Sequence, residues 1–120
     1  MAKRIVIIED DPNILELLIF ILEAEGYQIS PFATGIDAAE IGLLNPDMVL
    51  LDVSLIGYPK TGDQICGDLK KLLATSKIPV MLLSAEKDLA GISTACFSDD
   101  FLTKPFDIDE LVNKVKILSH

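Results

Sequence analysis

The fold is decided by residues 5–12, which read Ile5-Val6-Ile7-Ile8-Glu9-Asp10-Asp11-Pro12. Four consecutive apolar residues predict a β-strand that ends at a run of acids. Asp11 is a suitable helix N-cap and Pro12 suits the first helical position, so a helix is expected to begin directly after the strand. The stretch therefore predicts the strand–turn–helix unit with which an α/β domain opens, and it places acidic side chains in the turn.

The same alternation of strand and helix recurs along the whole chain. Strands are predicted at 4–8, 27–32, 47–51, 79–83 and 100–103. The first helix should end at Gly26, and later helices are expected at about 36–44, at about 63–74 and from 107 onward. Short connections between alternating elements predict one doubly wound parallel sheet with helices on both faces. The 120 residues are accordingly expected to form a single domain, 1–120.

The helix expected within 86–97 is the weakest prediction. This segment contains Gly91-Ile92-Ser93-Thr94, four poor helix formers in a row. It is expected to be short, frayed or partly irregular.

Polar residues follow four of the apolar strands. Glu9 and Asp10 end the first, Asp52 ends the third, Ser84 ends the fourth, and Lys104 lies just beyond the fifth. The carboxyl ends of parallel strands share one edge of the sheet, where ligands bind, so these side chains should meet. Each pair of carboxylates ~4 Å apart repels by roughly 4 kcal/mol at an effective dielectric of ~20. The oxygen cluster therefore predicts a cation, and Mg²⁺ suits its hard ligands.

Composition excludes several classes of function. The formal net charge of −9 argues against direct binding to nucleic acid or to an anionic membrane. Cys66 and Cys96 have no metal-ligand spacing and are expected to be free thiols in a reducing cytosol. No signal pattern precedes the first strand, and the longest apolar run, 17–22, is too short to span a bilayer. A cytoplasmic protein is expected.

Four motifs, in this order and spacing, resemble those of the receiver domain of two-component response regulators, over essentially the whole chain. They are Ile7-Ile8-Glu9-Asp10-Asp11-Pro12, Val49-Leu50-Leu51-Asp52, Leu83-Ser84-Ala85 and Asp99-Asp100-Phe101-Leu102-Thr103-Lys104-Pro105-Phe106. The resemblance implies a flavodoxin-like, CheY-like sheet of strand order 2-1-3-4-5.

The resemblance also implies a chemistry. Asp52 would be the phosphoacceptor, and Mg²⁺ would be held by Asp52, by Asp10 directly, by Glu9 through water and by the backbone carbonyl of Ser54. Ser84 would hydrogen-bond the phosphoryl group, and Lys104 would pair with Asp52 and later with the phosphate. Such a protein is a signalling switch that catalyses only its own phosphorylation and dephosphorylation.

Conformation and partners are implied as well. Phe101 and Ser84 match the switch positions, and Pro105 is expected to follow a cis peptide bond. The phosphoryl donor would be a phosphohistidine on a sensor histidine kinase or a histidine phosphotransfer protein. The output would pass to a downstream protein target, or to an effector domain outside this chain.

Other function classes remain open from the residues. A degenerate receiver could act as a docking module without phosphorylation. An aspartyl-nucleophile phosphatase of the haloacid dehalogenase type would need a second acid where Ser54 stands. A flavin or nucleotide binder would need a phosphate-cradling loop where Glu9, Asp10 and Asp11 stand.

Two segments depart from the family pattern. The loop after Asp52 is longer by about two residues, and its tip is expected near the site. The segment between Ser84 and Lys104 is about two residues shorter, and Phe97-Ser98 replaces the usual Gly-Ala. A standard dimer through this region is therefore not expected.

The first helix carries a candidate docking surface. Its predicted sheet-facing residues are Ile14, Leu15, Leu17, Leu18, Ile21 and Leu22. Ile19 and Phe20 lie outside that face and are hypothesised to form an exposed apolar patch for a kinase or phosphotransfer partner.

Overall fold

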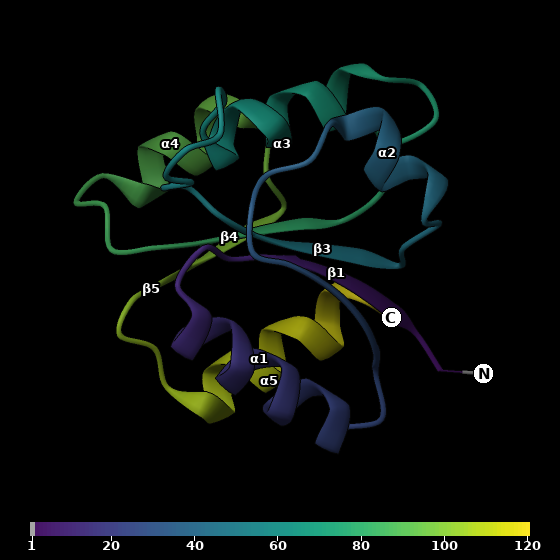
Figure 1. Ribbon diagram of the computed structural model, residues 1–120, viewed down its shortest axis with the longest axis vertical. Helices are drawn as coiled ribbons and strands as arrows, with labels where there is room; N and C mark the ends of the chain where they lie inside the picture. The colour runs from purple at the N-terminus through teal and green to yellow at the C-terminus, as the bar shows by residue number, and fades with distance from the viewer. Residues whose placement is uncertain (1) are drawn as a thin grey trace.

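The computed structural model describes residues 2–120, within which five strands alternate with five helices (Figure 1). The strands are β1 (Arg4–Ile8), β2 (Gln28–Phe32), β3 (Met48–Asp52), β4 (Val80–Ser84) and β5 (Asp100–Thr103). The helices are α1 (Pro12–Ala24), α2 (Ala38–Leu43), α3 (Gly62–Lys71), α4 (Leu89–Cys96) and α5 (Ile108–Leu118).

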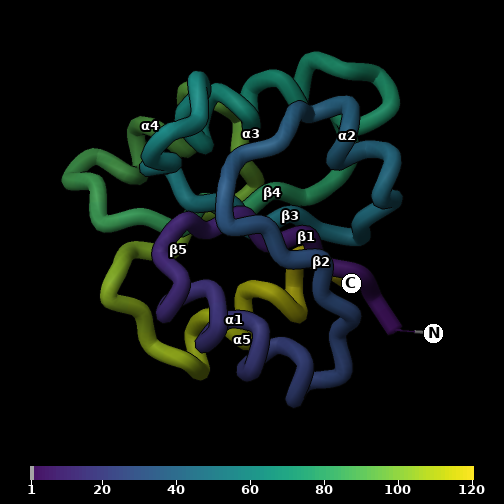
Figure 2. Tube along the Cα trace, in the orientation of Figure 1, coloured from purple at the N-terminus to yellow at the C-terminus, as the bar shows by residue number. Residues whose placement is uncertain are grey.

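All neighbouring strands are parallel, in the order β2-β1-β3-β4-β5, which confirms the predicted topology. Helices α1 and α5 cover one face of the sheet, and α2, α3 and α4 cover the other (Figures 1 and 2). From β1 the chain places β2 on one side, and it then returns to place β3, β4 and β5 on the other side. In sheets of this kind, ligands bind at the carboxyl ends of the strands beside that change of side, which here falls between β1 and β3.

The core consists of two layers, one on each side of the sheet. Successive strand residues alternate between the layers, so that Val6 and Ile8 pack toward α2 and α3 whereas Ile5 and Ile7 pack toward α1 and α5. Strands β1, β3 and β4 are almost entirely buried, which explains why their sequences are continuous apolar runs. Polar residues can therefore gather only where these strands end.

Helix α1 begins as the sequence predicts. The Asp11 carboxylate accepts hydrogen bonds from the N–H groups of Asn13 (2.9 Å) and Ile14 (3.3 Å), so Asp11 is an N-cap. Gly26, at φ +94°, lies just beyond the end of the helix. At the other end of the chain the Asp107 carboxylate caps α5 by accepting from the Glu110 N–H.

The packing of α1 differs from the prediction at one position. Leu18, Ile21 and Leu22 are buried as expected, but Leu17 is 43% exposed. Helix α1 lies beside α5 on the same face of the sheet, and only a narrow stripe of it reaches the core.

Helix α4 is short, as predicted, but it is a continuous α-helix and not a frayed one. The Asp88 carboxylate accepts from the Gly91 N–H and replaces a missing backbone bond in the first turn. Burial of Leu89, Ser93 and Cys96 then fixes the helix against the sheet and α3. Capping and packing together override the poor helix propensity of the segment.

No helix within residues 2–120 has the length and apolar character needed to cross a bilayer.

Candidate functional site

The polar residues that follow the strands meet in one cleft of about 630 Å³ at the carboxyl edge of the sheet. Its lining includes Glu9, Asp10, Asp52, Ser54, Ser84 and Lys104. These residues are far apart in the sequence, and the parallel register brings them together because β1, β3 and β4 end at the same level. The structure therefore assembles the acids, the hydroxyl and the ammonium that the sequence placed at strand ends.

Asp52 is the last residue of β3, and only 5% of it is exposed. Burial and the neighbouring Glu9 raise its pKa from 3.8 to about 7, because both disfavour a second negative charge. Lys104 and the Ser54 N–H, which donates to Asp52 Oδ1 at 3.3 Å, act in the opposite direction. A carboxylate in this setting is poised to take up a proton or a cation.

Lys104 lies between the two buried acids. Its Nζ atom is 2.6 Å from Glu9 Oε1 and 3.5 Å from Asp52 Oδ2. The sequence analysis paired Lys104 with Asp52, and in the structure Glu9 is the nearer partner. The Lys104 N–H donates to the Ser84 carbonyl at 2.8 Å, and the peptide bond to Pro105 is cis, the conformation implied by the resemblance.

Three carboxylates can hold a cation. Glu9, Asp10 and Asp52 each offer an oxygen, and these atoms lie within 4.8 Å of one another. Glu9 and Asp52 are buried, and Lys104 is the cation that lies between them. A cluster of hard oxygen donors with excess negative charge fits a divalent ion such as Mg²⁺. Ser54 lines the same cleft beside them.

Ser84 and Phe101 lie on adjacent strands. Ser84 ends β4, is 2% exposed, and its Oγ accepts a hydrogen bond from the Glu86 N–H at 3.1 Å. Phe101 is partly buried against the core layer of α2, α3 and α4, and Lys114 Nζ lies 5.9 Å from its ring centroid. Phe101 does not line the cleft.

The two hypothesised docking residues lie on α1, away from the cleft lining. Phe20 is 72% exposed and Ile19 is half-buried. Phe20 borders a separate groove of about 610 Å³ between α1 and α5, which also includes the half-exposed Ile108. Within the lining of this groove the exposed large apolar residues are Phe20 and Ile108, and Ile19 is not part of that lining.

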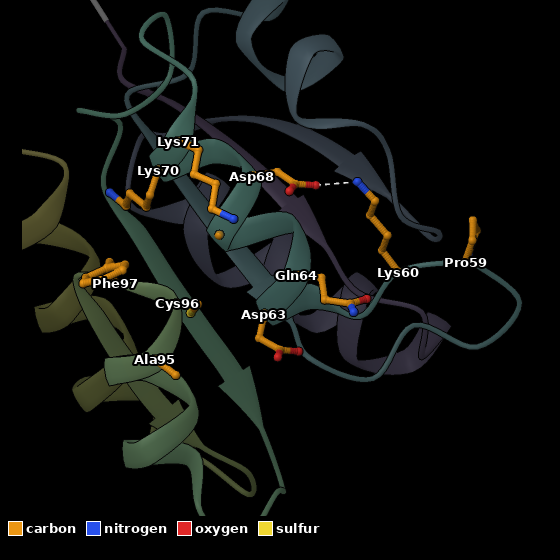
Figure 3. A pocket seen from close by; sticks show the side chains of 11 residues that line it. Pro59, Lys60, Asp63, Gln64, Asp68, Lys70, Lys71, Ala95, Cys96 and Phe97 are labelled. Atoms are coloured by element: carbon orange, nitrogen blue, oxygen red, sulfur yellow. Dashed lines mark hydrogen bonds and ion pairs between the residues drawn. The ribbon is translucent and has the colours of Figure 1, made fainter.

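Two features were missed by the sequence analysis. One is a groove of about 540 Å³ between α3 and α4, bordered by Lys60, which is paired with Asp68, and by the exposed Phe97 (Figure 3). Its lining comes from two helices and a loop that no sequence motif connects. The other is the bond from the Tyr58 hydroxyl to Asp37. Cys66 and Cys96 are free and buried, in agreement with the expected thiols, and Cys96 lines the α3–α4 groove.

An open parallel sheet of order 2-1-3-4-5, with an acidic cluster, a hydroxyl and a lysine at its carboxyl edge, defines the CheY-like receiver class. The chemotaxis protein CheY4 of Vibrio cholerae superposes with a TM-score of 0.81, at 18% identity, over 98% of this chain and 99% of that one, and shows the same fold. The family model of the response regulator receiver domain matches residues 5–116, and this chain belongs to that family.

Two relatives are more similar in sequence. The DNA-binding dual master transcriptional regulator RpaA of Synechocystis sp. is 36% identical over 96% of this chain and 48% of its own length. The response regulator TrrA of Thermotoga maritima, solved in complex with Mg²⁺–BeF, is 34% identical with a TM-score of 0.83, over 98% of this chain and 99% of that one. The chain spans about half the length of the curated relatives it matches.

Proposed function

We propose that this chain is a cytoplasmic phosphoacceptor switch in which Asp52 takes a phosphoryl group from a phosphohistidine on a partner protein. The observation that carries the proposal is the meeting of Asp52, Glu9, Asp10, Ser84 and Lys104 in one cleft. Membership in the receiver family and the Mg²⁺–BeF complex of the relative TrrA support it.

The reaction follows from the charges in the cleft. An Asp52 carboxylate oxygen forms a bond to phosphorus while the phosphorus–nitrogen bond of phosphohistidine breaks, and the released imidazole keeps the electron pair and takes up a proton. Bound Mg²⁺, held by Glu9, Asp10, Asp52 and the carbonyl of Ser54, would neutralise phosphoryl oxygens. The Lys104 ammonium lies 3.5 Å from Asp52, within reach of another phosphoryl oxygen.

The conformational response would begin at Ser84. Its hydroxyl now accepts from the Glu86 N–H and has its own proton free to donate. A phosphoryl group on Asp52 adds acceptor oxygens and up to about two negative charges, and the hydroxyl would turn toward them. Phe101, on the neighbouring strand, would follow into the space that Ser84 leaves.

The donor is proposed to be a sensor histidine kinase or a histidine phosphotransfer protein that docks on α1. Phe20 and Ile108 expose apolar surface along the α1–α5 groove, where a partner helix could bury it. The output is proposed to pass to a protein target or to an effector domain outside these residues.

Intact-protein mass spectrometry after incubation with Mg²⁺ and acetyl phosphate tests the proposal. One added phosphoryl group is expected on the wild type and on Asp63→Asn, a matched carboxylate outside the cleft. EDTA and Asp52→Asn should each abolish it. If the wild type takes up no phosphoryl group from acetyl phosphate or from its histidine kinase, the chain is a docking module instead.

Phe20→Asp tests the docking surface separately. Phosphotransfer from the cognate donor should slow by about tenfold or more, because a charge would replace a buried contact. Phosphorylation by acetyl phosphate should stay unchanged, since Phe20 does not line the cleft. Leu73→Asp, at a position that is 96% exposed and distant in sequence, is the matched control. Equal transfer rates for both variants would reject docking through Phe20.

A further inference from the structure

The long loop after Asp52 is built around a tight turn over residues 55–58. The Tyr58 N–H donates to the Leu55 carbonyl at 3.3 Å, and Gly57 has φ +84°. A positive φ at the third residue of a four-residue turn identifies type II, which favours glycine at that place. Ile56 is therefore the second residue of the turn, a position at which proline is well tolerated.

The turn is anchored at both ends. Leu55 is buried in the core layer of α2 and α3. The Tyr58 hydroxyl donates to Asp37 Oδ1 at 2.9 Å, and its ring lies so close to Gly35 that a Cβ there would be 2.4 Å from a ring carbon. The segment before α2 thus holds the far side of the loop, and glycine at position 35 makes that contact possible.

Between these anchors, the backbone of Ile56 contacts the acidic cluster. The Ile56 N–H donates to Asp10 Oδ2 at 3.0 Å, while the Ile56 side chain is 85% exposed. The contribution of this residue to the site is its N–H group, because its side chain lies in solvent. Asp10 is one of the three residues whose carboxylate oxygens lie within 4.8 Å of one another, so the Ile56 N–H holds a carboxylate that belongs to this cluster.

We propose that the turn 55–58, clamped by Tyr58 on Asp37 and Gly35, is a positioning element that presets the Asp10 carboxylate for a divalent cation through the Ile56 N–H. The proposal rests on the proposed function, since the cation is the one required for phosphorylation of Asp52. Hydrogen bonds to a ligating carboxylate orient it before the metal arrives, and their loss typically weakens metal binding by 10- to 100-fold.

The decisive variant is Ile56→Pro, measured by Mg²⁺ titration with calorimetry. Proline keeps the turn, replaces only an exposed side chain, and removes the N–H that Asp10 accepts. The Mg²⁺ dissociation constant is expected to rise about tenfold. Ile56→Ala keeps the N–H and should bind as the wild type does. Tyr58→Phe removes the bond to Asp37 and should weaken binding in the same direction by a smaller factor.

Hydrogen exchange of the metal-free protein provides a second readout. The Ile56 amide should be protected in the wild type and in Ile56→Ala, and should exchange faster in Tyr58→Phe. Thermal unfolding of Ile56→Pro should match the wild type, which separates positioning from general destabilisation. Equal Mg²⁺ affinity of Ile56→Pro and the wild type would reject the positioning role of the turn and would leave the proposed function unaffected. Absence of Mg²⁺ binding by the wild type would overturn both.

Discussion

At the scale of single residues, the site is governed by two buried carboxylates that share one ammonium. Glu9 is 1% exposed and Asp52 is 5% exposed, and Lys104 lies closer to Glu9 than to Asp52. The Lys104 ammonium therefore stabilises the negative charge of Asp52 less than that of Glu9, which agrees with the raised pKa of Asp52. Burial and the neighbouring Glu9 therefore destabilise the charged form of the Asp52 side chain in the metal-free protein.

Asp52→Asn should stabilise the metal-free protein at neutral pH. A pKa raised on folding from 3.8 to about 7 means that the folded state binds more protons within this window. The free energy of unfolding of the wild type should therefore fall as the pH rises from about 4 to 7. Asparagine carries no charge, so it removes the free-energy cost of burying an ionised Asp52 side chain. The variant should therefore be more stable by roughly 2 to 4 kcal/mol at pH 7.5.

Urea denaturation in EDTA at pH 4 and at pH 7.5 measures this effect. The difference in unfolding free energy between Asp52→Asn and the wild type should nearly vanish at pH 4, where the side chain at position 52 is neutral in both folded proteins. A variant that is no more stable at pH 7.5 would show that Lys104 fully compensates both acids.

At the scale of elements, the residue that ends α4 has a strained backbone conformation. Phe97 caps the helix at φ +62°, in the left-handed region that glycine adopts freely, and its ring is 74% exposed. The family commonly has glycine-alanine where Phe97-Ser98 stands here. The strain lies at the C-terminal end of the segment whose helix propensity is low.

Phe97→Gly should raise the free energy of unfolding by about 1 kcal/mol, because it relieves the left-handed conformation at little cost in buried surface. Phe97→Ala removes the ring but keeps the Cβ, and its stability should stay within about 0.5 kcal/mol of the wild type. Chemical denaturation of the three proteins gives the comparison. A less stable glycine variant would mean that ring packing over the α3–α4 groove outweighs the strain.

Helix boundaries show which elements a sequence can specify. The starts of α1 and α5 were predictable because Asp11 and Asp107 cap the helices that follow them directly in the chain. The end of α3 was predicted at about residue 74, but Lys71 is its last residue. Leu72 is already extended there, at ψ 129°, and the chain turns toward β4, a choice that local propensity does not encode.

At the scale of the whole molecule, cation binding and stability are linked. Two of the three carboxylates lie directly after β1 and the third ends β3, so a bound cation would join the ends of two strands that are already hydrogen-bonded. Unfolding separates the ligands and abolishes the site.

Mg²⁺ should raise the melting temperature in a concentration-dependent way. At 100 times the dissociation constant, the gain in unfolding free energy is ~2.7 kcal/mol. Asp10→Asn should lose most of this gain, whereas Asp63→Asn should retain it. Differential scanning calorimetry over a Mg²⁺ series makes the measurement, and an Mg²⁺-independent melting temperature would reject the site.

The sequence by itself determined the alternation of strands and helices and the polar strand-end residues that line the cleft, and its motifs implied the strand order through the resemblance to receiver domains. Continuous apolar strands can be buried only inside a doubly wound sheet, and the polar residues at strand ends then share one edge. The alternation of elements and the strand-end residues depend on the local order of apolar and polar residues, which can be read directly from the sequence.

Only the tertiary structure decided how those residues pair. The preference of Lys104 for Glu9, the exposure of Leu17, the α3–α4 groove and the clamp of Tyr58 on Asp37 each depend on contacts between separate elements. Such contacts depend on distances of a few ångströms set by packing of the whole core. Helix propensity and residue spacing do not specify such distances, because the same local sequence can pack against several different neighbours.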